Sequence, residues 1–192
     1  MRVNEIFESV QGEGFHSGRA AVFVRLSGCN LKCPFCDTEH QSYKDMSEEE
    51  IVAEIAKYGA ELVVITGGEP MLQLTETLVS RIHAIGRMVA VETNGTIPVP
   101  RIVDWITVSP KMAFVGEVGK PKLVFAHEVK VVFDGEHEPE DYDITSPHYY
   151  LQPCDTGDVK ANKDIYKKIV EYVKNNPKWK ISLQTQKILD VR

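Results

Sequence analysis

Short apolar runs alternate with amphipathic segments along most of the chain. Residues 20–27 (AAVFVRLS) and 62–66 (LVVIT) are rich in β-branched side chains, as is typical of buried strands. Between them, Ser47 and Glu50 have the spacing of a capping box at the start of an amphipathic helix. The pattern therefore predicts a strand, a helix and a second strand in succession.

The rest of the chain continues this alternation. Further strands are expected at 88–92, 105–109, 128–133 and 149–152, helices at 75–85 and 162–174, and a short closing strand at 181–183. Strands that alternate with helices imply right-handed βαβ units and a parallel sheet. We predict six core strands, with weak or absent helices after the third to fifth.

The length decides between a complete and a partial barrel. The 192 residues fit about one domain and fall short of the ~250 residues usual for eight β/α units. The expected fold is an α/β, partial (β/α)6 TIM-like barrel with reduced helices. No repeat or linker divides the chain. We expect a single domain over 1–192, with an N-terminal extension at 1–19 and the partial barrel and C-terminal segment at 20–192.

Charge and hydropathy narrow the class of partner. The net charge of −6 argues against nucleic acid or an anionic membrane as the main partner. No apolar run approaches the ~18 residues of a transmembrane helix. The first residues, MRVNE, lack the apolar run of a signal peptide. We expect a cytoplasmic protein whose thiols stay reduced.

Three of the four cysteines lie close together. Cys29, Cys33 and Cys36 form a C-x3-C-x2-C motif, and Cys154 lies far along the chain. A structural zinc site would need a fourth ligand, such as His40 or Cys154. A [4Fe-4S] cluster held by three cysteines would instead leave one iron free for a small molecule. A zinc-stabilised binding module and a cluster enzyme are both compatible with the spacing.

Polar or Gly- and Pro-marked residues follow five of the expected strands. They are 28–29 (GC), 66–70 (TGGEP), 92–95 (ETNG), 109–111 (SPK) and 152–155 (QPCD). The carboxyl ends of parallel strands meet at one edge, so these residues could form a single site. Taken singly, each has a structural explanation: turn glycines, a helix-start carboxylate at Glu69, a solvated Lys111, or a salt bridge at Arg25.

Two of these motifs together resemble a known superfamily. The cysteine triplet, with Phe35 before its last cysteine, is similar to the cluster motif of radical S-adenosylmethionine (SAM) enzymes. The TGGEP run at 66–70 resembles their second signature. The resemblance implies a [4Fe-4S] cluster that binds SAM at its open iron, and a 5′-deoxyadenosyl radical that abstracts hydrogen from a substrate.

Flanking segments narrow the resemblance further. Residues 8–14 (ESVQGEG), 23–31 (FVRLSGCNL), 36–38 (CDT) and 183–187 (LQTQK) are similar to the 7-carboxy-7-deazaguanine synthase family of queuosine and 7-deazapurine biosynthesis. The resemblance implies a lyase that contracts the ring of 6-carboxy-5,6,7,8-tetrahydropterin to 7-carboxy-7-deazaguanine and releases ammonia. It also implies Mg²⁺, an electron donor such as flavodoxin or ferredoxin, and a homodimer.

The same resemblance assigns site residues. Cluster ligands would be Cys29, Cys33 and Cys36, and Thr38 would bind Mg²⁺. SAM would contact Phe35, Asp37, Gly68, Glu69, Ser109, Lys111, Gln152 and Asp155. The pterin would contact Val10, Gln11, Gly12, Glu13, Arg25, Thr66, Glu92, Gln186 and Arg192. Arg25 suits the substrate carboxylate, and Glu92 is the candidate catalytic residue beyond the cofactor.

One position departs from the family pattern. Members commonly carry histidine where this chain has Gln186, and glutamine can hydrogen bond but cannot titrate. A positioning role therefore fits this residue better than proton transfer. A glycyl-radical activating enzyme shares the cysteine motif and is the alternative among enzymes. The Gln11–Gly14 segment and the C-terminal pattern favour the small-molecule enzyme.

The resemblance leads to a prediction about the C-terminus. The family uses its terminal carboxylate to contact substrate, and Arg192 lies in register with that pattern. A C-terminal tag should therefore raise the dissociation constant of the tetrahydropterin, measured by anaerobic equilibrium dialysis. An unchanged constant would contradict the assignment.

Overall fold

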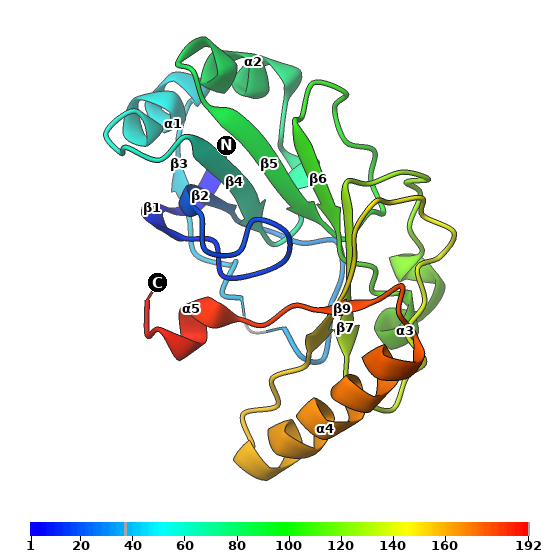
Figure 1. The fold of residues 1–192 in the computed structure, drawn as a ribbon. Helices are drawn as coiled ribbons and strands as arrows, with labels where there is room; N and C mark the ends of the chain where they lie inside the picture. Colours follow the sequence, from blue (N-terminus) through cyan, green and yellow to red (C-terminus); the bar gives the residue numbers. More distant parts are fainter. Residues whose placement is uncertain (37, 192) are drawn as a thin grey trace.

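One continuous sheet organises the chain (Figure 1). The computed structural model describes residues 1–36 and 38–191. The strands are β1 (Arg2–Val10), β2 (Ala20–Leu26), β3 (Lys44–Asp45), β4 (Leu62–Gly67), β5 (Met88–Thr93), β6 (Trp105–Val108), β7 (Glu128–Phe133), β8 (Tyr149–Pro153) and β9 (Lys180–Ile181). Their order in the sheet is β3-β1-β2-β4-β5-β6-β7-β8-β9. Strands β2 and β4–β9 run parallel, whereas β1 is antiparallel to both of its neighbours.

Helices and short turns connect the strands. They are α1 (Glu48–Ile55), η1 (Pro70–Leu72), α2 (Glu76–Ala84), α3 (Met112–Val115), η2 (Gly116–Gly119), α4 (Val159–Asn175) and α5 (Thr185–Ile188). Of the helices in the described residues, α1, α2 and α4 have more than two turns. Among the described residues, no helix links β5 to β6 or β7 to β8, and one short helix, α3, with the turn η2, links β6 to β7. The expected partial barrel with six core strands and reduced crossovers is confirmed.

The N-terminal strand β1 is the main element that is missing from the expected strands given above. β1 pairs with β2 along almost its whole length, with an irregularity between Val3 and Glu5. The expected extension at 1–19 therefore contributes a nine-residue strand to the sheet. The alternation of apolar and polar residues in β1 is hard to recognise for two reasons. Glu5 places a charge within the strand, and the pairing register with β2 shifts beside it.

Smaller differences occur near the C-terminal end. Helix α4 begins at Val159, three residues before the expected start, because Asp158 caps it by accepting a hydrogen bond from the Ala161 amide at 2.7 Å. The closing strand covers Lys180–Ile181 rather than 181–183. Helix α5 was not expected.

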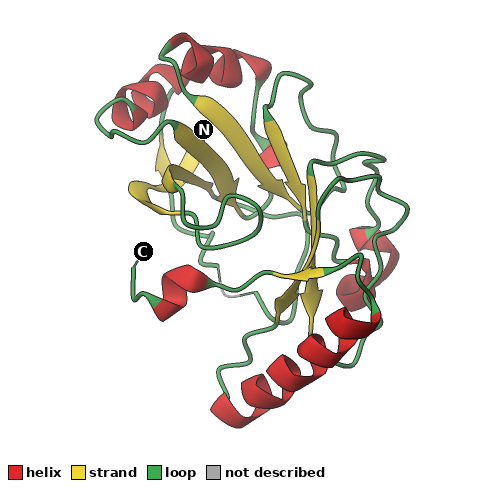
Figure 2. Cartoon of the chain, in the orientation of Figure 1, coloured by secondary structure: helices red, strands yellow, loops and turns green. Residues whose placement is uncertain are grey.

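Each parallel strand presents two different faces. The outer face of β2, β4 and β5 packs against α1 and α2, and the outer side of β7 and β8 packs against α4 (Figure 2). The inner face carries a separate apolar cluster at its base, comprising Ala21, Leu62, Val64 and Ala90 with Phe23, Met88 and Trp105 packed against them. Two positions further along these strands the inner residues are polar: Arg25, Thr66 and Glu92. The period-2 alternation thus gives the barrel a closed apolar base and a polar upper interior.

The longest helix, α4, has 17 residues and a polar average composition. No helix in the described ranges is both long and apolar enough to cross a membrane.

The capping box of α1 provides a stability prediction. Ser47 Oγ accepts from the Glu50 amide at 3.2 Å, and Glu50 Oε2 accepts from the Ser47 amide at 2.8 Å. Ser47→Ala should lower the free energy of unfolding by about 1 kcal/mol in urea titrations, because the helix loses its cap. Ser80→Ala, at an exposed position inside α2, is the matched control and should change it by less than about 0.5 kcal/mol. Equal effects would contradict the capping role.

Candidate active site

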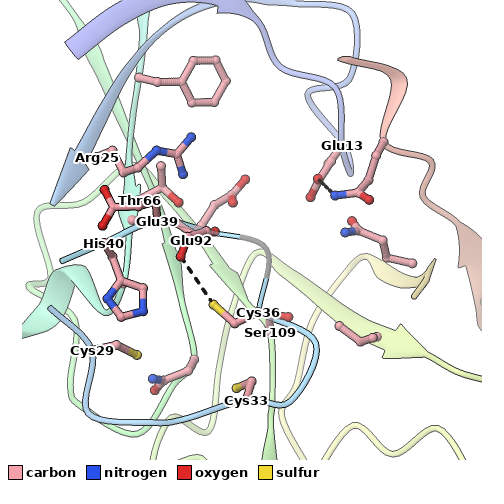
Figure 3. A pocket seen from close by; sticks show the side chains of 18 of the residues that line it. Glu13, Arg25, Cys29, Cys33, Cys36, Glu39, His40, Thr66, Glu92 and Ser109 are labelled. Atoms are coloured by element: carbon pink, nitrogen blue, oxygen red, sulfur yellow. Dashed lines mark hydrogen bonds between the residues drawn. The ribbon is translucent and has the colours of Figure 1, made fainter. Parts of the chain in front are cut away.

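A large cavity opens at the carboxyl ends of the parallel strands. Its volume is about 1100 Å³, above the ~300–1,000 Å³ of most small-molecule pockets, so it has room for more than one group. Expected site residues that line it are Val10, Gln11, Gly12, Glu13, Arg25, Cys29, Cys33, Phe35, Cys36, Thr38, Thr66, Gly68, Glu92, Ser109, Lys111, Gln152, Asp155 and Gln186. Side chains far apart in the sequence therefore share one cavity, as the strand-end pattern predicts (Figure 3).

Among the expected residues that the structure describes, Glu69 is the one outside this lining. Glu69 has no exposed surface, and its carboxylate is used inside the protein. The assignments made for Asp37 and Arg192 lie outside the described residues.

The three clustered cysteines lie on the loop that follows β2 (Figure 3). All are free thiols on the cavity wall, Cys29 and Cys33 half-buried and Cys36 exposed. Among the described residues, no three His, Cys, Asp or Glu side chains converge as ligands of a single ion. A [4Fe-4S] cluster binds each cysteine through a different iron, so it fits thiols spread along a wall better than a tetrahedral zinc ion does. Burial raises the pKa of both Cys29 and Cys33, so ligation there must release protons.

Backbone contacts join the TGGEP turn to the cysteine loop. The Gly68 amide donates to the Leu26 carbonyl at 3.0 Å, and the Glu69 amide donates to the Gly28 carbonyl at 2.9 Å. A Cβ on Gly68 would lie 2.0 Å from the Gly28 carbonyl oxygen, so only glycine permits this approach. The two signature motifs are therefore one structural unit, which leaves the Gly67–Gly68 backbone along the cavity.

Glu69 connects this unit to the end of β5. Its carboxylate accepts from the Met71 amide at 3.0 Å, the Thr93 hydroxyl at 2.7 Å and the Asn94 amide at 2.8 Å. Burial raises its pKa, and these hydrogen bonds oppose the rise. Its helix-start position at η1 matches the structural explanation considered for this residue.

A group of residues from β6, β8 and the cysteine loop forms the expected SAM side. Lys111 Nζ donates to the carbonyl and hydroxyl oxygens of Ser109 at 2.8 and 2.5 Å, and burial lowers the lysine pKa to about 8. Phe35 packs edge-on against Phe114, with ring centroids 4.6 Å apart. Gln152 Oε1 is buried and has no hydrogen-bond partner among the described residues. Such an orphaned acceptor suits a polar ligand.

Arg25 lies on the opposite wall, from β2. Its Nε donates to Glu5 Oε1 at 2.8 Å, so the salt bridge considered for Arg25 exists. A guanidinium has five N–H donors, and this bond uses one of them. An internal ion pair and a ligand contact are therefore compatible at Arg25, and Glu5 holds the side chain against the cavity wall.

The remaining wall is built around a buried lysine that sequence reasoning missed. Lys130 on β7 forms ion pairs with Glu13 and, at 3.6 Å, with Glu92. Glu92 Oε1 also accepts from Gln11 Nε2 at 2.9 Å. Glu13 Oε1 accepts from the side-chain amides of Gln184 and Gln186, both at 3.0 Å.

The charges in this wall set one another's protonation. Burial would raise the pKa of Glu13, but the charge of Lys130 and the hydrogen bonds to Glu13 outweigh it and lower that pKa to about 2. Burial alone would lower the pKa of Lys130, yet the surrounding carboxylates raise it well above its usual value. Both groups are therefore charged at neutral pH. The signal in the sequence was Glu128 and Lys130 at alternate positions of the apolar run 128–133.

Comparisons with known proteins agree with this geometry. Residues 23–108 match the Radical SAM superfamily. A 7-carboxy-7-deazaguanine synthase of Bacteroides thetaiotaomicron is 44% identical over 191 residues, covering 100% of this chain and 98% of that protein. The enzyme of the same name from Haemophilus influenzae is 36% identical and covers 97% of this chain and 92% of its own length. The crystal structure of QueE from Escherichia coli has a TM-score of 0.72 at 27% identity, covering 95% of this chain and 92% of that one.

The partial barrel, the cysteine loop and the adjoining TGGEP turn define the radical SAM class of enzymes, for which a [4Fe-4S] cluster and SAM are the shared cofactors. Within that class, the chain belongs to the 7-carboxy-7-deazaguanine synthase family.

The hydrogen bonds of the buried Glu69 predict that this residue stabilises the fold. Glu69→Ala leaves three buried donors without an acceptor and should lower the free energy of unfolding by about 3 kcal/mol or more, measured by urea denaturation. Glu140→Ala, on an exposed loop, should change it by less than about 0.5 kcal/mol. A stability change at Glu69 no larger than in this control would show that the carboxylate does not hold the two strand ends together.

Proposed function

We propose that this chain converts 6-carboxy-5,6,7,8-tetrahydropterin to 7-carboxy-7-deazaguanine and ammonia, as one catalytic domain. The observation that carries the proposal is the single cavity in which the cysteine loop faces a wall of Arg25, Glu13 and Glu92. Full-length similarity to relatives named for this product supports it. The conversion is redox-neutral overall, so it needs no net oxidant or reductant, and a radical initiator that is regenerated in each catalytic cycle is sufficient.

The cofactor half of the cavity follows from the cysteine loop. Cys29, Cys33 and Cys36 would hold the cluster, which when bound supplies the electron that cleaves SAM. Gly68 would offer its backbone to SAM, and Ser109, Lys111, Gln152 and Asp155 would bind its polar groups, with Phe35 beside the adenine. Two observations support this division: Gln152 Oε1 has no partner within the described part of the chain, and the Lys111 ammonium donates to the Ser109 hydroxyl.

The substrate half is the wall of charges on the other side. Arg25 would bind the pterin carboxylate through its remaining N–H groups, which is the natural pairing of a guanidinium. Glu13 and Glu92 would accept N–H bonds from the guanidine-like edge, with Val10, Gln11, Gly12 and Thr66 alongside. Gln186 donates to Glu13, so we assign it a positioning role, which needs no titratable group.

Further components complete the proposal. Thr38, at the cavity wall, would contribute a hydroxyl oxygen to Mg²⁺, with other ligands from substrate and water. A flavodoxin or ferredoxin would reduce the cluster in the cytoplasm. Among the described strands, β3 and β9 each have a single neighbour, and such open edges favour a homodimer that covers one of them.

Anaerobic turnover tests the proposed function. Protein with a reconstituted cluster should convert the tetrahydropterin to 7-carboxy-7-deazaguanine in the presence of SAM, Mg²⁺ and reductant, with about one ammonia released per product. Chromatography of the product and an ammonia assay measure both. SAM cleavage without pterin turnover would overturn the proposal and favour a glycyl-radical activating enzyme.

Cluster loading distinguishes the cysteines. Cys33→Ala should lose most of its iron, sulfide and brown absorbance near ~400 nm after anaerobic reconstitution, because one iron loses its thiolate. Cys154→Ala is the matched control, since Cys154 packs in the apolar cluster beside α4, and its iron content should equal that of the unmodified protein. Bound zinc in place of iron and sulfide would contradict the cluster.

A further inference from the structure

Lys130 is the only lysine of β7 and it has almost no exposed surface: 7% of its side chain is accessible. A lysine is rarely buried to this extent unless carboxylates surround it. Its two partners come from different parts of the chain, Glu13 from the loop after β1 and Glu92 from β5. The ammonium of Lys130 therefore bridges two carboxylates that belong to the same wall of the cavity.

The link extends to the C-terminal segment. Glu13 receives amide donors from Gln184 and Gln186, while Glu92 receives one from Gln11. Both glutamates also line the cavity. A shift of the Lys130 ammonium would therefore displace two acceptors at once.

The charge balance explains why the cation is needed. Glu13, Glu92 and the buried Glu128 of β7 all act electrostatically on Lys130, and Lys111, after β6, is a second cation close enough to interact with it. Without Lys130, two cavity carboxylates would remain near each other with no cation between them, and the pair would retain a proton at higher pH. A protonated carboxyl offers one acceptor fewer to a ligand that presents N–H groups.

We propose that Lys130 is a positioning residue for the substrate: its ammonium balances the charge of Glu13 and Glu92 and holds both carboxylates correctly spaced to accept hydrogen bonds from the guanidine-like edge of the pterin. The inference rests on the proposed function. It assigns substrate specificity to this ion-pair network. Among the described residues, no hydrogen bond or ion pair joins Lys130 to Ser109, Lys111 or Gln152 on the SAM side.

The test measures binding without chemistry. Protein loaded with the oxidised cluster and SAM, but given no reductant, is titrated with 6-carboxy-5,6,7,8-tetrahydropterin by anaerobic equilibrium dialysis between pH 6 and 9. Lys130→Met should raise the substrate Kd at least about tenfold at pH 7. Its Kd should then fall as pH rises, because the shared proton leaves the carboxylate pair, whereas the unmodified protein has a flat profile.

Companion variants separate positioning from folding. Lys130→Arg restores the cation and should restore the flat pH profile. Lys130→Gln keeps a donor for Glu13 without the charge, and answers the same question if Lys130→Met does not fold. Lys167→Met, on the exposed face of α4, is the matched control and should leave the Kd unchanged. The Kd of SAM should be the same in all of these proteins.

Each outcome is decisive. Unchanged substrate Kd in Lys130→Met and Lys130→Gln would overturn the inference, as would a weakened Kd that is independent of pH or accompanied by equal loss of SAM binding. If the unmodified protein does not bind the tetrahydropterin, the proposed function itself fails, and this result is separate from the behaviour of the variants.

Discussion

The two-residue alternation of side chains along parallel strands is the constraint on which this molecule depends. It directs Val22, Val24 and Leu26 outward, where they share one apolar cluster with α1 and α2. The intervening residues point inward, and there the composition changes with height, from Phe23 at the base to Arg25 at the cavity. A one-residue slip in any strand would exchange these faces, placing a charge among apolar side chains. The core and the site are therefore specified by the same register.

Elements that are determined by local sequence pattern could be predicted from the sequence alone. Buried strands are rich in apolar and β-branched residues, so 62–66 and 128–133 could be placed within a residue of β4 and β7. The strand-end motifs could be assigned to one edge because parallel strands leave no other arrangement. The Ser47 capping box was equally local.

What could not be predicted depends on partners distant in the chain. Strand β1 contains Glu5, whose place in a sheet makes sense only once Arg25 is known to lie beside it. Glu128 and Lys130 alternate in the run 128–133 and so share one face of the strand, but Lys130 is separated from Glu13 by 117 residues, and the run does not indicate which carboxylates lie beside the lysine. Glu69 also depends on distant partners. Its motif suggested a ligand contact, but its carboxylate accepts hydrogen bonds from the Asn94 amide and the Thr93 hydroxyl inside the protein.

The two sides of the cavity differ in how strongly they are attached to the core of the protein. The cysteine loop is tied by backbone hydrogen bonds to the TGGEP turn at the ends of central strands. The wall that contains Glu13 is completed by α5. Thr185 donates to the Gly12 carbonyl from both its amide and its hydroxyl, and α5 buries none of its residues. Local unfolding of such a segment costs far less than global unfolding. Equilibrium fluctuations that release α5 can therefore expose the Glu13 side of the cavity while the cysteine loop stays hydrogen-bonded to the TGGEP turn, so the two sides of the cavity can open independently.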